Sequence, residues 1–144
     1  MVCAMPRAPR PQSFRLPQQL LDQLRRVAER RSTSQTALVR RYIEEGLKMD
    51  EYPMIVFRDG ALGRRAMLEG SRLDVVQIIE TIRNSDGSIE AAAEYLSLSV
   101  ARVQACVRYY ADHAEEIDEY AAQVDEETER LRAAWERQQA ALAS

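Results

Sequence analysis

The chain has 144 residues, a net charge of −3 and 46% hydrophobic residues, which fits one globular domain or two very small ones. Two cysteines and one histidine, without metal-ligand spacing or an activated nucleophile, predict no metal, no cofactor and no enzymatic activity; Cys3 and Cys106 are expected to be reduced thiols. The N-terminus lacks the apolar segment of a secretory signal, and no apolar run approaches the roughly 20 residues that span a bilayer. A cytoplasmic protein without membrane contact is therefore expected.

The charge changes sign along the chain. Residues 1–48 carry ten Lys/Arg and four Asp/Glu, residues 49–113 carry seven and ten, and residues 114–144 carry three and nine. The net charges of the three segments are therefore +6, −3 and −6. A basic first segment predicts a polyanionic partner, and an acidic last segment predicts a different one.

The first 50 or so residues predict one short strand and two helices. Residues 1–10 are rich in proline and arginine, which predicts a flexible basic arm. Residues 12–16, with the sequence QSFRL, alternate polar and apolar side chains as a half-buried strand does. Pro17 ends this strand and suits the first turn of a helix, because its missing N–H would be unpaired there anyway. Two stretches of helical spacing follow within residues 11–49, and the turn between them offers three possible N-caps for the second helix: Ser32, Thr33 and Ser34.

This strand predicts a dimer, because one strand cannot satisfy its own backbone hydrogen bonds and so small a unit cannot bury a sufficient core alone. We expect a homodimer in which two copies of the strand pair antiparallel, with Phe14 and Leu16 of both chains in the dimer core. Ser13 and Arg15 would then lie on the outer face of a two-stranded ribbon, which has the size that enters the major groove of DNA. An ordinary solvated charge is the alternative for Arg15.

The order of these features resembles the ribbon-helix-helix repressors of the Arc/MetJ/CopG family: R-L-P, an amphipathic helix, a Ser/Thr turn and then L-V-R-R-Y-I. The resemblance implies two sets of DNA contacts: to bases from Ser13 and Arg15, and to phosphates from Ser34, Gln35 and Thr36. Free N–H groups and the helix dipole favour an anion at the start of the second helix whatever the family. Pro11 departs from the family pattern because it cannot donate to a ladder, so the ribbon is expected to begin at Gln12.

Residues 50–53 are predicted as a linker, and residues 54–116 as a second small domain. Two short apolar strands flank a turn with two glycines, which predicts a β-hairpin. The helix LDVVQIIETIR ends at NSDG, and two further helices begin at Ser88 and Ser99 as N-caps. The residues expected in the core of this domain are Leu73, Val76, Ile79, Ile82, Leu96, Leu98, Val103, Val107 and Tyr110.

The last two of these helices have the spacing of a helix-turn-helix. With the hairpin in front, the segment resembles the small winged-helix antitoxins that are paired with PIN-like toxins, and RYYADHAEEID at 108–118 is similar to that family's C-terminal signature. A second DNA surface on this domain would use Ser99, Gln104 and Arg108. The alternative, which the negative charge of the segment favours, is that this face serves dimerisation or contact with a toxin.

From Ile117 onward the spacing alternates between four and three residues, a repeat of about 3.5 residues that is typical of a helix with one apolar seam. The seam consists of Ile117, Ala121, Val124, Thr128, Leu131, Trp135, Gln138 and Leu142. Residues 117–144 are predicted as an acidic amphipathic helix that orders on a partner protein, with Leu131 and Trp135 as anchors. A helix folded back on its own domain and a disordered end are the alternatives. The resemblance adds a basic residue that would enter the acidic site of a PIN-like toxin, and it leaves three candidates open: Arg130, Arg132 and Arg137.

These elements predict a mainly α fold: a ribbon-helix-helix dimer module, a small winged helix-turn-helix domain and a C-terminal helix. The function that the resemblances imply is that of a nucleoid-associated, DNA-binding antitoxin of a bacterial type II toxin–antitoxin system. It would repress its own operon and neutralise a PIN-like ribonuclease toxin. The alternative is a free-standing transcriptional repressor or nucleoid-associated protein, in which the tail only drives higher-order assembly.

Overall fold

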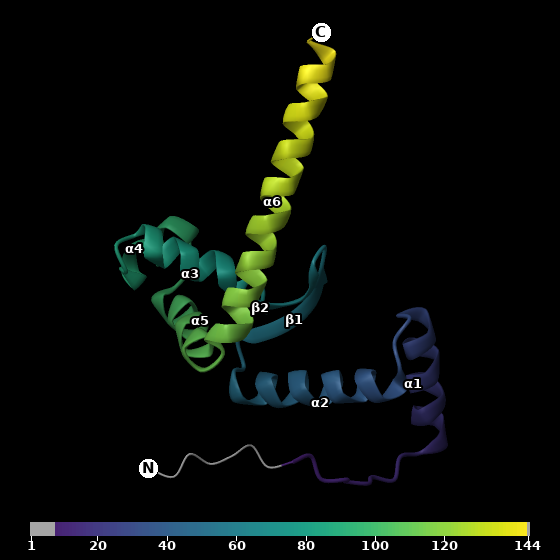
Figure 1. The fold of residues 1–144 in the computed structure, drawn as a ribbon. Helices are drawn as coiled ribbons and strands as arrows, with labels where there is room; N and C mark the ends of the chain where they lie inside the picture. Colours follow the sequence, from purple (N-terminus) through teal and green to yellow (C-terminus); the bar gives the residue numbers. More distant parts are fainter. Residues whose placement is uncertain (1–7, 144) are drawn as a thin grey trace. The chain divides into compact units, whose positions relative to one another are not determined.

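The computed structural model describes residues 8–143, and the chain divides into two compact units, Met1–Ile43 and Glu44–Ser144. The described residues form six helices and one two-stranded sheet (Figure 1), so the predicted mainly helical fold class is confirmed. The arm predicted at residues 1–10 lies outside the described residues except for 8–10, which are exposed and without regular secondary structure. None of the helices described combines the length and the apolar character that a bilayer crossing requires.

The first unit contains helix α1 (Gln18–Arg30) and the beginning of helix α2 (Gln35–Glu51). Pro17 stands directly before α1, and its carbonyl accepts the Leu21 amide at 3.1 Å, so the proline marks the start of the helix. Between the two helices Ser32 has a positive φ of 51°, which reverses the chain before α2 begins.

The strand predicted at residues 12–16 is not present in the single chain, where residues 8–17 have no regular secondary structure. A strand needs a hydrogen-bonding neighbour, and the sequence pattern assigns that neighbour to a second copy of the chain. Phe14 is 72% exposed and Leu16 is 41% exposed. The two residues predicted for the dimer core are therefore uncovered in one chain by itself.

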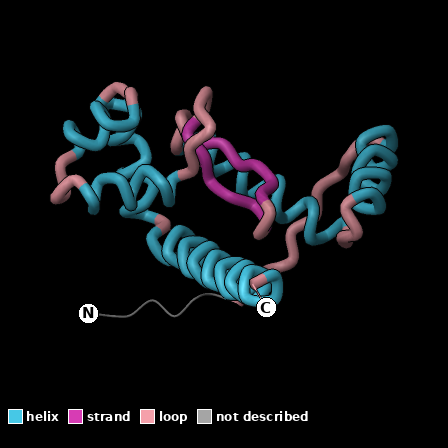
Figure 2. Tube along the Cα trace, turned by 90° about the horizontal axis from the view of Figure 1, so that it is seen from above, coloured by secondary structure: helices cyan, strands magenta, loops and turns pink. Residues whose placement is uncertain are grey.

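The second unit begins within α2 and continues with a β-hairpin, in which β1 (Ile55–Gly60) pairs antiparallel with β2 (Gly63–Leu68). Figure 2 shows the two strands, in magenta, as one hairpin. The tight turn between them requires Gly63, whose φ of +112° would be strained in a residue with a side chain. The hairpin predicted from the sequence is confirmed.

Four helices follow the hairpin: α3 (Val75–Asn84), α4 (Ile89–Leu96), α5 (Val100–Asp112) and α6 (Ala114–Leu142). Ser88 and Ser99 cap α4 and α5 as predicted, because each hydroxyl accepts a backbone N–H from the first turn of its helix. Ser97 ends α4 with a positive φ of 55°, and this residue makes the turn between α4 and α5.

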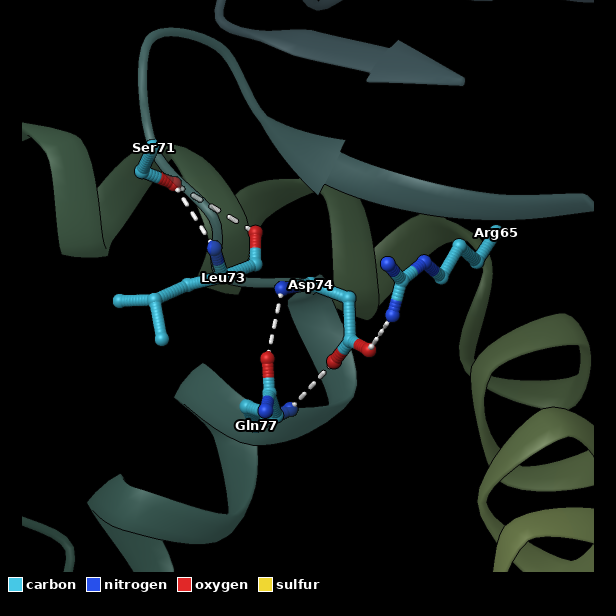
Figure 3. Close-up of polar contacts among 5 residues, drawn as sticks. All are labelled: Arg65, Ser71, Leu73, Asp74 and Gln77. Carbon is cyan, nitrogen blue, oxygen red and sulfur yellow. Dashed lines mark hydrogen bonds and ion pairs between the residues drawn. The ribbon is translucent and has the colours of Figure 1, made fainter. Parts of the chain in front are cut away.

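Helix α3 starts at a buried polar contact (Figure 3). The Asp74 carboxylate accepts the Gln77 amide at 2.8 Å, and the Gln77 side chain accepts the Asp74 amide at 3.0 Å. Arg65 on β2 donates to the second carboxylate oxygen at 3.3 Å, and the Ser71 hydroxyl accepts the Leu73 amide at 3.1 Å. Because Asp74 is only 5% exposed, these bonds satisfy a buried charge while they tie the hairpin to α3.

The hydrophobic core of the second unit lies between the hairpin and helices α3, α5 and α6. Its fully buried side chains include Ile55, Leu68, Val75, Ile78, Val103, Cys106 and Tyr109. Among the predicted core residues, Val76, Ile79 and Val103 are buried, whereas Leu73, Ile82, Leu96, Leu98, Val107 and Tyr110 are partly buried and pack against the core.

The buried face of α5 is turned by one residue from the predicted one. The sequence pattern placed Tyr110 in the core, but Tyr109 is fully buried and Tyr110 is only partly covered. Polar contacts hold Tyr110 at the surface: its hydroxyl donates to Asp118 at 2.9 Å and accepts from Arg83 at 2.7 Å, and both contacts are exposed. The Tyr109 ring instead packs with Phe57 of the hairpin inside the core.

The linker predicted at residues 50–53 is wrong as a description of this segment. Helix α2 continues through Glu51, and Tyr52 is 4% exposed. The Tyr52 ring lies edge-on to Tyr109 with ring centroids 5.0 Å apart, and its hydroxyl donates to Asp112. These contacts come from residues far along the chain, and they make the end of α2 part of the second unit.

Helix α6 is continuous over 29 residues, but only its beginning belongs to the core. Ile117 is 4% exposed, and Tyr120 and Ala121 are partly buried against the core cluster. Beyond the half-buried Val124 the apolar seam residues Leu131, Trp135 and Leu142 are exposed, and in Figure 1 the last turns, in yellow, extend away from the hairpin and from α3 to α5. The first turns thus fold back on their own domain, whereas the remainder presents an apolar stripe that no described residue covers.

Candidate nucleic-acid interface

The first unit presents an apolar groove of about 620 Å³. Its lining comes from the segment before α1 and from the facing sides of α1 and α2: Phe14, Leu16, Leu20, Gln23, Leu24, Val27, Val39, Tyr42 and Ile43. Within residues 8–43 the fully covered apolar residues are Ala28 and Leu38. Units of about 40 residues or fewer usually need oligomerisation or another source of stability, so a cover over this groove would add burial that the small core lacks.

The base-reading candidates lie in the same segment as the groove residues. Ser13 and Arg15 alternate in sequence with Phe14 and Leu16, and all four are exposed. Side chains that alternate along an extended chain point to opposite faces once the chain is held in a sheet. Closing Phe14 and Leu16 over the groove would therefore turn Ser13 and Arg15 outward.

The phosphate-binding candidates lie at the exposed start of α2. The Ser34 hydroxyl accepts the Ala37 amide at 3.0 Å, and the Ser34 carbonyl accepts the Leu38 amide at 3.0 Å. The amides of Gln35 and Thr36 precede the first donor of the helix, so they have no acceptor within it. Together with the positive end of the helix dipole, these two amides form a suitable anion-binding end.

An acidic side chain stands near this end of the helix. Asp22 of α1 lines the same shallow depression as Gln35. Its carboxylate accepts from Arg25 at 2.6 Å and from Gln18 at 3.1 Å, both on α1. The ion pair with Arg25 offsets the negative charge of Asp22, and the depression as a whole is close to neutral before any phosphate approaches.

A second surface lies along α5 in the second unit. Gln104 and Arg108 line a groove of about 620 Å³, whereas Ser99 is not among its lining residues. The other lining residues are mostly apolar: Tyr52, Pro53, Met54, Ile55, Ala101 and Ala105. The Arg108 guanidinium lies over the Tyr52 ring, 5.5 Å from its centroid. The structure therefore joins two of the three candidate residues on a face that is more apolar than basic, and it uses the Ser99 hydroxyl as a helix cap.

This groove could not be found from the sequence. Its lining includes Tyr52, which lies within the predicted linker 50–53, and Ile55, which follows it. The sequence feature that indicates a packed segment here is the run Y-P-M-I-V-F, in which apolar residues continue from Tyr52 into β1. A linker between independent domains is more polar than this.

A polar cluster in the second unit joins three helices. Glu116 of α6 accepts from Lys48 of α2 at 2.8 Å and from the Tyr109 hydroxyl of α5 at 3.0 Å. Burial raises the pKa of Tyr109 above its ordinary value, and the hydrogen bond to Asp112 raises the pKa of Tyr52 to about 12. Both tyrosines therefore stay neutral at physiological pH and act as hydrogen-bond donors that hold the helices together.

The free thiol of Cys106 lies in the same core. It is fully buried, and burial raises its pKa to about 12, so the thiol stays neutral and unreactive. Cys3, the other predicted reduced thiol, lies outside the described residues.

The partner-binding candidates of α6 are exposed. Leu131 and Trp135 are 61% and 60% exposed. Two of the three basic candidates are engaged within the helix: Arg130 pairs with Glu127 at 2.7 Å, and Arg132 pairs with Glu129 at 3.3 Å. The third, Arg137, is exposed as well.

Comparison with known proteins finds no family model, no curated protein and no solved structure that matches the chain. The functional argument therefore rests on the residues, contacts and charges described above.

Proposed function

We propose that this protein is a homodimeric DNA-binding repressor whose first unit forms a ribbon-helix-helix dimer. The observation that carries the proposal is the uncovered apolar groove, which ends in Phe14 with 72% of its surface exposed. Fully burying one large apolar side chain contributes roughly 1.5–3 kcal/mol. Several such residues line the groove, so covering it with a second copy supplies the stability that a single unit lacks.

The second copy also provides the missing strand partner. Two segments at residues 12–16 pair antiparallel, and each supplies the backbone donors and acceptors that the other needs. The pairing turns Ser13 and Arg15 to one face, where an arginine can bind guanine in the major groove through two hydrogen bonds. The starts of the two α2 helices then bind phosphates on either side, and the net charge of +6 on residues 1–48 adds attraction to DNA.

The proposal places the protein in the cytoplasm, at the nucleoid, and its test is a binding titration. The probe is a duplex that covers the region upstream of the protein's own reading frame, with a shuffled duplex of equal length as the competitor. Arg15→Ala should weaken specific binding by roughly 5- to 150-fold, which corresponds to the loss of about 1–3 kcal/mol for one base contact. The matched control is Arg26→Ala, which removes the same charge from an exposed position of α1.

Arg26→Ala should change the affinities for the upstream and the shuffled duplex by the same small factor, because a phosphate contact does not depend on the DNA sequence. Equal losses of specificity for the two variants would contradict a base contact by Arg15. No preference of the unchanged protein for the upstream duplex would contradict repression of its own promoter.

A second candidate function adds a toxin to this scheme. The exposed stripe with Leu131 and Trp135 favours a protein partner, as an antitoxin of a type II system would have in a PIN-like ribonuclease. The test requires a toxin-like protein encoded in the adjacent reading frame, expressed with the full chain, with a chain that ends at residue 123, or with Trp135→Ala. Growth rescue by the full chain, but by neither the shortened chain nor Trp135→Ala, supports neutralisation through α6. Rescue by the shortened chain would assign inhibition to the rest of the protein.

A further inference from the structure

The second half of α6 has an apolar stripe that nothing in the described chain covers. Leu131, Trp135 and Leu142 are 61%, 60% and 81% exposed, while Val124 at the near end of the stripe is half-buried. Residues 124–142 make a stretch of about 28 Å at about 1.5 Å per residue. The periodicity of 3.5 residues is that of a helix that packs along another helix.

The stripe is complementary to itself when two copies run in opposite directions. If Leu131 lies opposite Trp135 of the second copy, every remaining seam residue between 124 and 142 also falls opposite a seam residue. The facing layers are Leu131 with Trp135, Thr128 with Gln138, and Val124 with Leu142. Apolar residues thus meet apolar residues, polar residues meet polar residues, and the alternation of three and four residues stays in register throughout.

The charges favour the same direction. Residues 115–129 contain eight Asp/Glu and no Lys/Arg, whereas residues 130–142 contain three Arg and one Glu. A parallel pair would set each acidic stretch beside its own copy, and like charges side by side are unfavourable. In the antiparallel pair Glu129 lies at the level of Arg137 of the second copy, and Arg130 lies at the level of its Glu136. Arg132 meets its own copy near the centre, where its ion pair with Glu129 reduces the repulsion.

We propose that residues 124–142 of α6 pair antiparallel with the same residues of a second copy of the chain, so that α6 is a self-association helix. This inference does not depend on DNA binding by the first unit. It competes with the toxin candidate for the same stripe, and the match of the seam with itself in every layer favours the second copy.

The test uses cysteines at the polar layer of the seam. Thr128→Cys and Gln138→Cys are made separately in the full-length protein with Cys3→Ser, which leaves the buried Cys106 as the other thiol. Chains with different tags are co-expressed and oxidised. In the antiparallel register, residue 128 faces residue 138 of the second copy, but two copies of residue 128 stand about 15 Å apart along the axis. The mixed pair should form a disulfide at least tenfold more efficiently than either variant with itself.

A second measurement uses the single tryptophan of the chain. Trp135 emission should shift to shorter wavelength and resist acrylamide quenching as protein concentration rises, because pairing buries its ring. Leu131→Asp should raise the concentration needed for this change at least tenfold. The control Ala133→Asp introduces the same charge at an exposed position that is not part of the seam, and it should leave the change in place.

Three results would overturn the proposal. Efficient disulfides within each cysteine variant alone would show a parallel pair. The absence of any inter-chain disulfide, together with a Trp135 emission that does not depend on concentration, would show that α6 does not bind its own copy. A toxin-like protein that protects Trp135 under those conditions would then assign the stripe to that partner.

Discussion

Phe14→Ala distinguishes a dimeric first unit from a monomeric one, because the substitution should cost much more stability in a dimer than in a monomer. In one chain the Phe14 side chain is 72% exposed. Truncating it there removes about a quarter of the roughly 1.5–3 kcal/mol that full burial supplies, so a monomer would lose less than about 1 kcal/mol. In a dimer that buries Phe14 in the shared core, the loss is about 3–5 kcal/mol for each core aromatic removed.

A loss of about 3 kcal/mol per dimer, counted conservatively, weakens dimerisation more than 100-fold. The assay is sedimentation equilibrium of the full chain in a Leu131→Asp background, which removes association through α6. Tyr95→Ala is the control, because Tyr95 is 80% exposed on α4 and outside the groove. A dimerisation constant that Phe14→Ala leaves within threefold of the control would refute the burial of Phe14 between two chains.

The remaining predictions concern the second unit. Asp74→Ala removes the cap of α3 and leaves the Gln77 amide and the Arg65 guanidinium without their acceptor, so urea unfolding should show a loss of about 1–2 kcal/mol. The control Asp50→Ala, at an exposed position of α2, should change the free energy of unfolding by no more than about 0.5 kcal/mol. Tyr109→Phe removes the hydrogen bond to Glu116 and should lower the free energy of unfolding by about 1 kcal/mol. Tyr109→Ala empties a fully buried site and should lower it by about 3–5 kcal/mol. Equal losses for the two variants would mean that the hydroxyl, and not the packing of the ring, carries the effect. Burial raises the pKa of Cys106 from 9.0 to about 12, so the thiol loses its proton at a lower pH in the unfolded state than in the folded state. The free energy of unfolding should therefore fall as the pH rises above 9. Cys106→Ala should flatten this fall, and an unchanged pH profile of stability would contradict the prediction.

Local patterns in the sequence were sufficient where short-range contacts decide the structure. The hairpin turn depends on Gly63, and the starts of α4 and α5 depend on Ser88 and Ser99, all of which act on residues within one turn. For the same reason the start of α2 could be placed within the cluster Ser32, Thr33 and Ser34, of which the structure uses Ser34 as the cap.

Contacts between residues far apart in the sequence determine two features that local patterns could not predict: the packing of residues 50–53 and the buried face of α5. Asp50 and Pro53 suggest a linker locally, but Tyr52 between them packs against Tyr109, 57 positions further along the chain. Tyr109 and Tyr110 are equally apolar, so periodicity alone could not choose the buried one. The choice depends on polar partners from α6 that accept one hydroxyl inside and the other at the surface.

The strand predicted at residues 12–16 belongs to a third category, since the hydrogen-bonding partner expected for it is a second copy of the chain. Alternation of polar and apolar residues indicates the strand, and the exposure of Phe14 and Leu16 indicates that something covers them. Within residues 8–143 no strand pairs with this segment, so the ribbon remains a prediction that needs two copies.

The central claim is that two copies bind one DNA site through the first unit, and the most direct measurement is the stoichiometry and salt dependence of binding to the upstream duplex. We predict an even number of chains per duplex, preference over the shuffled duplex, and an affinity that falls steeply with salt, since each phosphate contact contributes about −0.9 to the slope of log K against log salt. A single bound chain, or equal affinity for the two duplexes, would contradict the claim.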